Sequence, residues 1–286
     1  MKVEVAGCSG FCFGVKRALR IVEEALKKNK GKQVYSFGPI IHNNQVVEEL
    51  SRRGLRTIRK LDGINEGVVV ISSHGASPKI FEQVKTKGLT LIDATCPYVM
   101  SAQKIVKSLI EEGYSVLIFG DSNHPEVESL VGFADGKAIV VGQESELWKT
   151  PALSRRVGIV SQTTQSLKNY FEIISKMLKK GFMEVRIFNT ICTDTQKRQE
   201  SAAQLAKLVD VMIIVGGKIS ANTKRLFDIC SKICKNTYLV ETVQELQSEW
   251  FKDKTKVGVA SGASTPDWII EGIKNEILLT RGIYAK

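Results

Sequence analysis

The chain has 286 residues, of which 43% are hydrophobic and 25% charged, so it can bury the core of a globular protein. No apolar run reaches the ~18 residues of a membrane span, and Met1–Ala6 alternates like a strand rather than like a signal peptide. The formal net charge is +11, but lysines gather where helices are expected to end, which weakens the case for nucleic-acid binding. We therefore expect a cytoplasmic protein with neither a membrane nor a nucleic-acid partner, whose cysteines are thiols or metal ligands.

Helical and strand patterns alternate along the chain. Apolar offsets of four, three and four predict an amphipathic helix over Gly14–Asn29, followed by a strand over Gln33–Phe37. Further strands are predicted at Val68–Ser73, Leu89–Asp93, Val116–Gly120, Val157–Ser161, Glu184–Phe188, Val211–Gly216 and Val257–Ser261. Helices are predicted between these strands, opening near Ser77–Pro78, Tyr98, Ser166, Cys192 and Thr265–Pro266.

This order indicates α/β architecture with small, mainly parallel sheets. We predict three pseudo-equivalent αβα units, 13–96, 97–192 and 193–286, arranged around a central cluster. The first two units end in a strand, whereas the third ends in a helix near Thr280. The strand Val3–Ala6, within residues 1–12, is therefore predicted to join the sheet of the third unit.

Three cysteines mark the repeat, because Cys12, Cys96 and Cys192 each stand just before a helical pattern. If each unit delivers one thiolate to a shared centre, the simplest occupant is an iron–sulfur cluster with one iron left open. Two alternatives are zinc between the thiolates, which has no redox chemistry, and ordinary buried cysteines. Cys8 competes with Cys12 as the ligand of its segment, while Cys230 and Cys234, placed one turn apart on a helix, are expected in the core.

Polar side chains occupy the loops in which six strands are expected to end, where open parallel sheets bind ligands. All three histidines of the chain lie in these loops, with serine, threonine and asparagine: His42, His74, His124, Thr163, Thr164, Ser220, Asn222 and Ser264. Neutral donors at helix N-termini suit a phosphate or diphosphate. The two serines and two threonines also have an alternative role as helix caps.

Glu126 is the carboxylate embedded in one of these loops, beside His124 and Pro125. Burial there would raise its pKa toward neutrality, so we predict that it delivers protons. The alternative is a first-turn glutamate favoured by the helix dipole.

These motifs, which cover essentially the whole chain in order, resemble the family of 4-hydroxy-3-methylbut-2-enyl diphosphate reductases of the methylerythritol phosphate route to isoprenoids. The resemblance rests on 10–18 (GFCFGVKRA), 38–43 (GPIIHN), 73–75 (SHG), 93–97 (DATCP), 124–127 (HPEV), 162–164 (QTT), 189–192 (NTIC) and 261–266 (SGASTP).

The resemblance implies one [4Fe–4S] cluster on Cys12, Cys96 and Cys192, and a reductive dehydroxylation that yields isopentenyl and dimethylallyl diphosphate. It implies that Glu126, with His124, Thr163 and Thr164, manages protons. The implied substrate-binding residues are His42, His74, His124, Thr163, Ser220, Ala221, Asn222 and Ser264. It also implies an acidic electron donor, ferredoxin or flavodoxin, which suits the positive charge.

One residue departs from the pattern, because some family members have Ser-Ser-Asn where this chain has Ser220-Ala221-Asn222. Ala221 offers only its backbone N–H, so we expect a changed affinity and a retained function. We expect a monomer or weak dimer. The alternative function is a non-redox phosphate- or nucleotide-binding α/β enzyme with structural cysteines.

Overall fold

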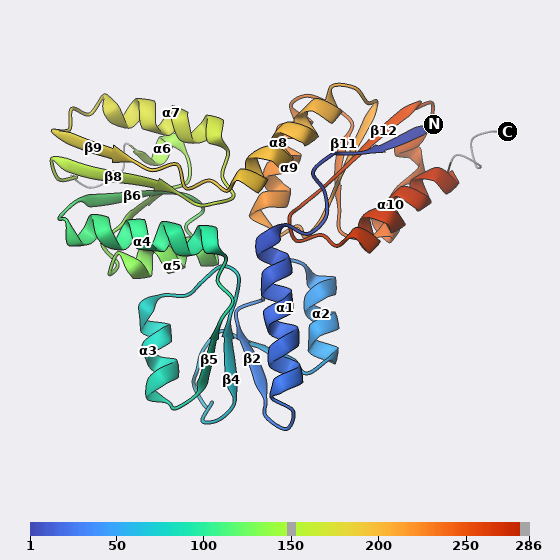
Figure 1. Cartoon of the computed structure of the whole chain (residues 1–286). Coiled ribbons are helices and arrows are strands. Elements are labelled where there is room, and N and C mark those ends of the chain that lie inside the picture. Colours follow the sequence, from blue (N-terminus) through green and yellow to red (C-terminus); the bar gives the residue numbers. More distant parts are fainter. Residues whose placement is uncertain (148–152, 281–286) are drawn as a thin grey trace. The chain divides into compact units, whose positions relative to one another are not determined.

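A computed structural model describes residues 1–147 and 153–280. They form three sheets of four parallel strands, each flanked by helices (Figure 1). The first sheet has the order β3 (Leu55–Ile58), β2 (Val34–Phe37), β4 (Val68–Ile71), β5 (Thr90–Asp93). The second has β7 (Ile139–Val141), β6 (Ser115–Phe119), β8 (Arg156–Ser161), β9 (Glu184–Ile187). The third has β11 (Thr237–Val240), β10 (Val211–Val215), β12 (Lys256–Ser261), β1 (Lys2–Val5). The predicted α/β class with three small parallel sheets is confirmed.

The first strand of the chain occupies the edge of the third sheet. β1 pairs in parallel with β12, with Val3 opposite Val257 and Val5 opposite Val259. β1 thus takes the place that β5 and β9 hold in the other two sheets. The N-terminal strand therefore completes the sheet built by the last hundred residues, as the incomplete third repeat required.

Three strands have no counterpart among those predicted: β3, β7 and β11, each at a sheet edge. These strands have three or four residues, and in β3 the buried Leu55 is followed by exposed Arg56 and Thr57. A run of three or four residues is too short for pattern alone to distinguish a strand from a loop or a helix segment.

The helices begin where the sequence signals them. Proline occupies the first position of α3 (Pro78–Thr86), α4 (Pro97–Glu111) and α5 (Pro125–Phe133), where its missing N–H costs nothing. The others are α1 (Phe13–Lys28), α2 (Asn44–Arg52), α6 (Glu144–Leu147), α7 (Leu167–Leu178), α8 (Thr193–Ala206), α9 (Ala221–Ser231) and α10 (Asp267–Thr280), with 3₁₀ turns η1 (Val243–Glu245) and η2 (Ser248–Phe251). The prediction that Cys230 and Cys234 share a helix was wrong, because α9 ends at Ser231.

Apolar side chains pack on both faces of each sheet, as expected for strands that are apolar at consecutive positions. In the second sheet Leu117 and Ile159 pack with α7, whereas Val116 and Val160 pack with α4 and α5 on the opposite face. The third sheet is covered by α10 on one face and by α8 and α9 on the other (Figure 1). Helices on both faces leave the carboxyl ends of the strands as the place for a site.

The described contacts group the chain into two compact units. We call them the terminal unit (Met1–Phe13, His42–Asn44 and Thr193–Lys286) and the middle unit (Gly14–Ile41 and Gln45–Cys192). The predicted boundaries 13–96, 97–192 and 193–286 stay a prediction. Within residues 1–147 and 153–280, no helix is both long and apolar enough to cross a lipid bilayer.

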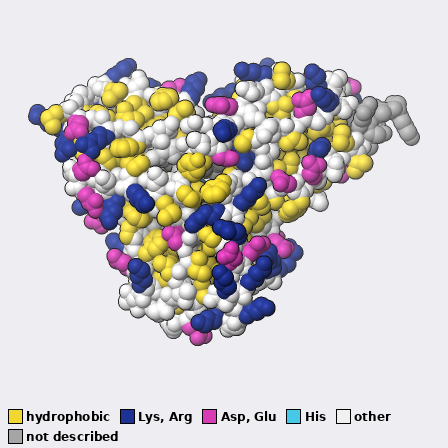
Figure 2. All heavy atoms as spheres, viewed as in Figure 1, with side chains coloured by type: hydrophobic (Ala, Val, Ile, Leu, Met, Phe, Trp, Pro, Cys, Tyr) yellow, Lys and Arg dark blue, Asp and Glu magenta, His cyan; other side chains and the backbone are white. Residues whose placement is uncertain are grey.

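The positive charge is spread over the molecular surface on the face drawn in Figure 2. Lys and Arg side chains are interspersed there with Asp and Glu and with apolar side chains. Some exposed cations sit in i,i+4 pairs with acids, such as Lys28 with Glu24 and Lys107 with Glu111. Such pairs are ordinary helix chemistry, so the net charge of +11 does not by itself describe a nucleic-acid surface.

Candidate active site

The central feature of the middle unit is a buried carboxyl group held by a neighbouring loop. Glu126 is 2% exposed and stands in the first turn of α5, directly after the β6 loop. Its Oε1 accepts from the backbone N–H of Thr163 at 2.6 Å, and its Oε2 accepts from Thr163 Oγ1 at 2.8 Å. Thr163 follows β8, the strand adjacent to β6, so parallel pairing brings the two loops together.

Burial governs the protonation of Glu126. Loss of water raises the pKa of Glu126 to about 7, although both hydrogen bonds from Thr163 act to lower it and the negative charge of Asp121 adds a smaller increase. A carboxyl group with such a pKa is protonated in half of the molecules near neutrality. It can therefore give up a proton to a reacting group and be recharged.

This assignment predicts a pH-dependent stability that can be measured without turnover. A raised pKa in the folded state stabilises the protein below the unfolded pKa, and this stability is lost as pH rises through about 7. Glu126→Gln removes the effect, so its unfolding free energy should decline less than that of the wild type between about pH 5 and about pH 8, by about 3 kcal/mol. Urea unfolding of both proteins at the two pH values measures the difference; equal declines would place Glu126 in a solvated site.

Two histidines meet at the start of α5, the helix on which Glu126 stands. His124 caps α5, and its Nδ1 accepts from the backbone N–H of Glu126 at 3.2 Å. A backbone N–H only donates, so Nδ1 carries no proton and the neutral imidazole carries its hydrogen on Nε2. The rings of His74 and His124 meet edge to face, with centroids 5.6 Å apart, and Ser72 Oγ lies 3.4 Å from His74 Nδ1. The β4 and β6 loops thus present their histidines side by side.

The predicted binding residues of the terminal unit also gather at strand ends. His42 is half-buried, and its backbone carbonyl accepts from Ser264 Oγ at 3.0 Å. Burial, with the nearby positive charge of Lys224, lowers the pKa of His42 to about 4, so this ring is neutral at pH 7. Gly217 packs against the same carbonyl, at a distance that leaves no room for a Cβ atom. The loops after β10 and β12 therefore enclose His42.

Two polar residues, Ser220 and Asn222, stand at the start of α9 and differ in their hydrogen bonding. Ser220 Oγ accepts from the backbone N–H of Thr223 at 3.4 Å, so the capping role that was its alternative is present. Asn222 is buried, and neither Nδ2 nor Oδ1 finds a hydrogen-bond partner among the described residues. An unsatisfied buried amide costs stability unless a ligand satisfies it. Thr223 Oγ1 shares this situation within the described residues, and no sequence signal marked it.

The three predicted cysteine ligands occupy equivalent places. Each follows the edge strand of its sheet and donates its backbone N–H to the residue two beyond the end of the neighbouring strand. The bonds are Cys12 to Ala263 O at 3.1 Å, Cys96 to Ser73 O at 3.0 Å and Cys192 to Thr163 O at 2.9 Å. All three residues are partly exposed and stand immediately before a helix. The three cysteines, which the sequence spacing marked as equivalent, therefore also make equivalent backbone hydrogen bonds.

The other cysteines differ from these three. Cys8 lies within hydrogen-bond reach of Asp194, with Sγ 3.9 Å from Oδ1, and burial raises the pKa of its thiol. Cys230 and Cys234 are buried in the core beside α8 and α9, as predicted, and burial raises the pKa of Cys230 to about 12. A thiol that resists ionisation is a poor metal ligand.

Convergence of the three ligand cysteines stays a prediction. Cys12 belongs to the terminal unit, whereas Cys96 and Cys192 belong to the middle unit. Over the described residues, no three His, Cys, Asp or Glu side chains form a group that could hold a metal ion. The donor set itself suits an iron–sulfur cluster, because three partly exposed thiols begin three helices whose N-termini favour thiolates.

Thr164, also predicted to be catalytic, is bound by Gln162, whereas Thr163 binds Glu126. Its Oγ1 accepts from Gln162 Nε2 at 2.8 Å, and Gln162 in turn accepts from the backbone N–H of Asp121. Gln162 was recognised only as part of a motif and received no role. No local pattern distinguishes a glutamine that bridges two loops from one that faces solvent.

Comparison with known proteins gives concordant matches along the chain. Residues 3–278 match the family described as LytB protein. A 4-hydroxy-3-methylbut-2-enyl diphosphate reductase of Geotalea uraniireducens is 45% identical over 277 residues, covering 97% of each chain, and one of Thermoanaerobacter pseudethanolicus is 43% identical over 285 residues, covering 99% of this chain and 98% of the other.

Two solved structures are also similar. A structure described as (E)-4-hydroxy-3-methyl-but-2-enyl diphosphate reductase, the terminal enzyme of the non-mevalonate pathway, is 45% identical with a TM-score of 0.69, covering 98% of this chain and 100% of the other. The E-1-hydroxy-2-methyl-but-2-enyl-4-diphosphate reductase of Plasmodium falciparum is 30% identical with a TM-score of 0.90, covering 96% of this chain and 86% of the other.

Proposed function

The chain belongs to the LytB protein family, and we propose that it acts as the curated relatives are named, as an oxidoreductase that reduces 4-hydroxy-3-methylbut-2-enyl diphosphate. In this reaction the bond between carbon and the hydroxyl oxygen breaks, and two electrons and two protons are consumed. One proton leaves with the hydroxyl as water and the other is added to carbon, which gives isopentenyl or dimethylallyl diphosphate. The reaction therefore needs an electron source, a proton source and an anchor for the diphosphate.

For electron transfer we propose one [4Fe–4S] cluster per chain, held by Cys12, Cys96 and Cys192. These three residues follow β1, β5 and β9, and equivalent backbone bonds hold them to the loops after β12, β4 and β8. When bound, the cluster supplies the electrons and a Lewis-acidic iron. Three protein thiolates leave one iron without a protein ligand, by the logic that marks open catalytic metal sites.

The observation that carries the proposal is the pairing of Glu126 with Thr163. Glu126 is buried and, with a pKa of about 7, carries a proton in about half of the molecules at neutral pH. The hydrogen bonds of Thr163 to its oxygens hold the carboxyl group in one orientation. Transfer of the proton from this carboxyl group assists departure of the hydroxyl as water, and Thr163 stabilises the carboxylate that is left. We propose that His124, the N-cap of the helix that carries Glu126, and Thr164 take part in this proton transfer.

We propose that neutral donors anchor the diphosphate. His42 is neutral at pH 7, and His124 offers an Nε2–H because its Nδ1 is already engaged. The first turn of α9 adds backbone N–H groups, including that of Ala221, where helix geometry favours anions. The remaining members of the set are His74, Thr163, Ser220, Asn222 and Ser264. This arrangement recognises the diphosphate without a clamp of arginines.

Asn222→Ala tests the anchor. A hydrogen bond to a charged group contributes about 1.5–3 kcal/mol, so loss of this amide should raise KM roughly tenfold or more with kcat little changed. The free enzyme should lose no thermal stability, because an amide without a protein partner is removed. Ser220→Ala is the contrast, because Ser220 caps α9 and its loss should cost about 1 kcal/mol of stability. Normal KM in Asn222→Ala would remove this residue from the anchor.

An acidic electron-transfer protein, ferredoxin or flavodoxin, is the proposed donor, because the chain carries a net charge of +11. We propose a cytoplasmic location and a monomer or weak dimer. The deciding experiment is an anaerobic assay with 4-hydroxy-3-methylbut-2-enyl diphosphate and a low-potential reductant, with detection of both products. Absence of turnover in protein shown to carry iron and sulfide would overturn the proposal.

A further inference from the structure

A buried glutamine bridges the β6 and β8 loops of the middle unit. Gln162 follows β8 and is 0% exposed. Its Oε1 accepts from the backbone N–H of Asp121 at 2.9 Å, in the loop after β6, and its Nε2 donates to Thr164 Oγ1 at 2.8 Å. Because a backbone N–H can only donate, the orientation of the amide is determined. Both ends of the amide are therefore used.

The β6 and β8 loops approach closely where Gly120 packs against Gln162. Gly120 lies so near Gln162 and Val127 that an added Cβ atom would stand 2.8–2.9 Å from their side chains. The Gln162 bridge and the Thr163–Glu126 hydrogen bonds connect the same two loops, on consecutive residues of the β8 loop. Moving one loop would disturb both sets of bonds.

We infer that Gln162 is a positioning residue for the reaction, which locks the β6 loop to the β8 loop and thereby holds Glu126 against Thr163. This inference rests on the proposed role of Glu126. Gln162 acts through its neighbours, since its amide is already satisfied by Asp121 and Thr164. Its contact also orients Thr164, whose hydroxyl oxygen accepts from Nε2 and whose hydrogen is left to donate elsewhere.

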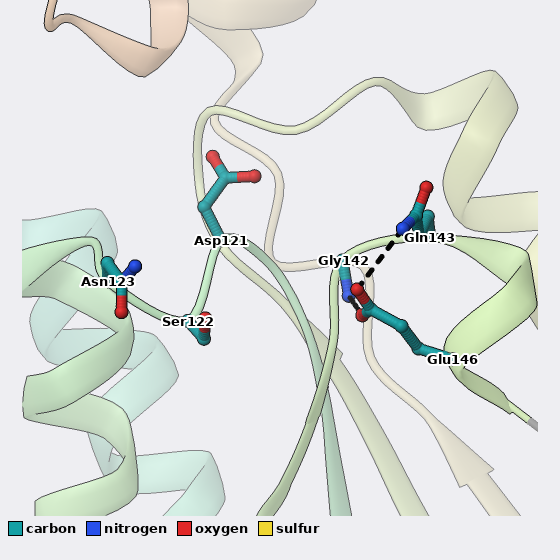
Figure 3. Close-up of a pocket in the computed structure, with 6 residues that line it drawn as sticks. All are labelled: Asp121, Ser122, Asn123, Gly142, Gln143 and Glu146. Atoms are coloured by element: carbon teal, nitrogen blue, oxygen red, sulfur yellow. Dashed lines mark hydrogen bonds between the residues drawn. The ribbon is translucent and has the colours of Figure 1, made fainter. Parts of the chain in front are cut away.

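A polar pocket lies at the β6 loop, where it is lined by Asp121, the residue whose N–H binds Gln162. The pocket has a volume of about 370 Å³, with Asp121, Ser122 and Asn123 on one wall and Gly142, Gln143 and Glu146 on the other (Figure 3). Asp121 lines the pocket and also donates to Gln162. Removal of the Gln162 side chain would leave a polar space next to this pocket, which water enters readily.

The groups that can titrate around Glu126 are few. Asp121 and His124 come from its own loop, and His74, on the β4 loop, meets His124. The β8 loop contributes neutral groups, which are the hydroxyls of Thr163 and Thr164 and the amides of Gln162 and Gln165, the latter 3.4 Å from Asp121 Oδ1. Helix α4 packs against α5, and its neutral Gln103 donates to Ser129 of α5. A change in the pH dependence of turnover upon substitution of Gln162 therefore reports on Glu126 and its immediate partners.

Two substitutions of Gln162 in the cluster-loaded enzyme test the inference, because they should shift the alkaline limb of the kcat–pH profile in opposite directions. Gln162→Ala admits water beside Glu126, so kcat should fall roughly 10²-fold, as small misplacements do, and the alkaline limb of kcat should move to lower pH. Gln162→Glu keeps the length and the bond from Asp121 N–H, and Thr164 Oγ1 can turn to donate to the new carboxylate in place of accepting from Nε2. The added negative charge should move the limb to higher pH, and the variant should retain more of kcat than Gln162→Ala. KM should change little in both.

Gln103→Leu is the matched control, because Gln103 is another buried glutamine of the same unit, with Nε2 2.7 Å from Ser129 Oγ. It should lower the melting temperature as Gln162→Ala does and leave the alkaline limb in place. A fall in kcat with an unmoved limb in both Gln162 variants, or a limb that moves equally in Gln103→Leu, would reduce Gln162 to a structural role. If Gln162→Ala does not fold, Gln162→Glu decides alone. Normal turnover in Glu126→Gln would instead overturn the proposed function.

Discussion

Glu126→Gln is expected to lower kcat by roughly 10²–10⁴-fold, the contribution that a positioned general acid makes. The substitution preserves shape, and the amide oxygen can still accept one hydrogen bond from Thr163, whose N–H lies 2.6 Å and whose Oγ1 lies 2.8 Å from the carboxyl oxygens. What is lost is the proton, because an amide does not ionise near neutrality. KM and the iron content should stay near those of the wild type, since Glu126 neither anchors the diphosphate nor binds iron in this proposal.

The measurement is steady-state turnover across pH, with iron determined on the same preparations. Glu128→Gln is the matched control, because Glu128 stands on the same helix turn and is exposed. It should keep kcat and the alkaline limb that Glu126 sets near pH 7. If Glu126→Gln turns over normally, another group supplies the proton.

Replacement of any one of Cys12, Cys96 or Cys192 by serine is expected to abolish turnover, because the variant should lose most of its iron. The three residues hold equivalent positions, each bound through its N–H to the neighbouring strand-end loop. A missing thiolate would leave two protein ligands for a cluster that ordinarily has four. The wild-type protein, prepared without oxygen, should contain close to four iron and four acid-labile sulfide per chain and absorb broadly in the visible range.

Iron, sulfide and the visible spectrum are measured on wild type and variants prepared side by side. Cys230→Ala is the control, since Cys230 is buried in the core of the terminal unit and should keep both colour and turnover. Cys8→Ser decides between Cys8 and Cys12 as the ligand of the first segment, and it should retain the cluster. A colourless wild type that takes up zinc, or one that stays colourless after reconstitution, would contradict the redox mechanism.

Patterns along the chain predicted the central strands and most helices. Runs such as Val68–Ile71 and Val211–Val215 are buried on both faces, and prolines at the starts of α3, α4 and α5 mark those boundaries. The strands β3, β7 and β11 escaped prediction because runs of three or four residues leave a weak pattern. The end of α9 before Cys234 was likewise missed, since no glycine or proline marks it.

Sequence alone determined which residues are equivalent, because a repeated order of strand, cysteine and helix is a local property of the chain. It thereby identified Cys12, Cys96 and Cys192 and assigned the histidines to strand ends. Tertiary structure decided the protonation of the site. The pKa of Glu126 depends on burial and on Thr163, 37 residues away, and the hydrogen on His124 depends on the bond at its Nδ1. The role of Gln162 likewise exists only where two loops meet, because desolvation and hydrogen bonding act between residues that are distant in the chain.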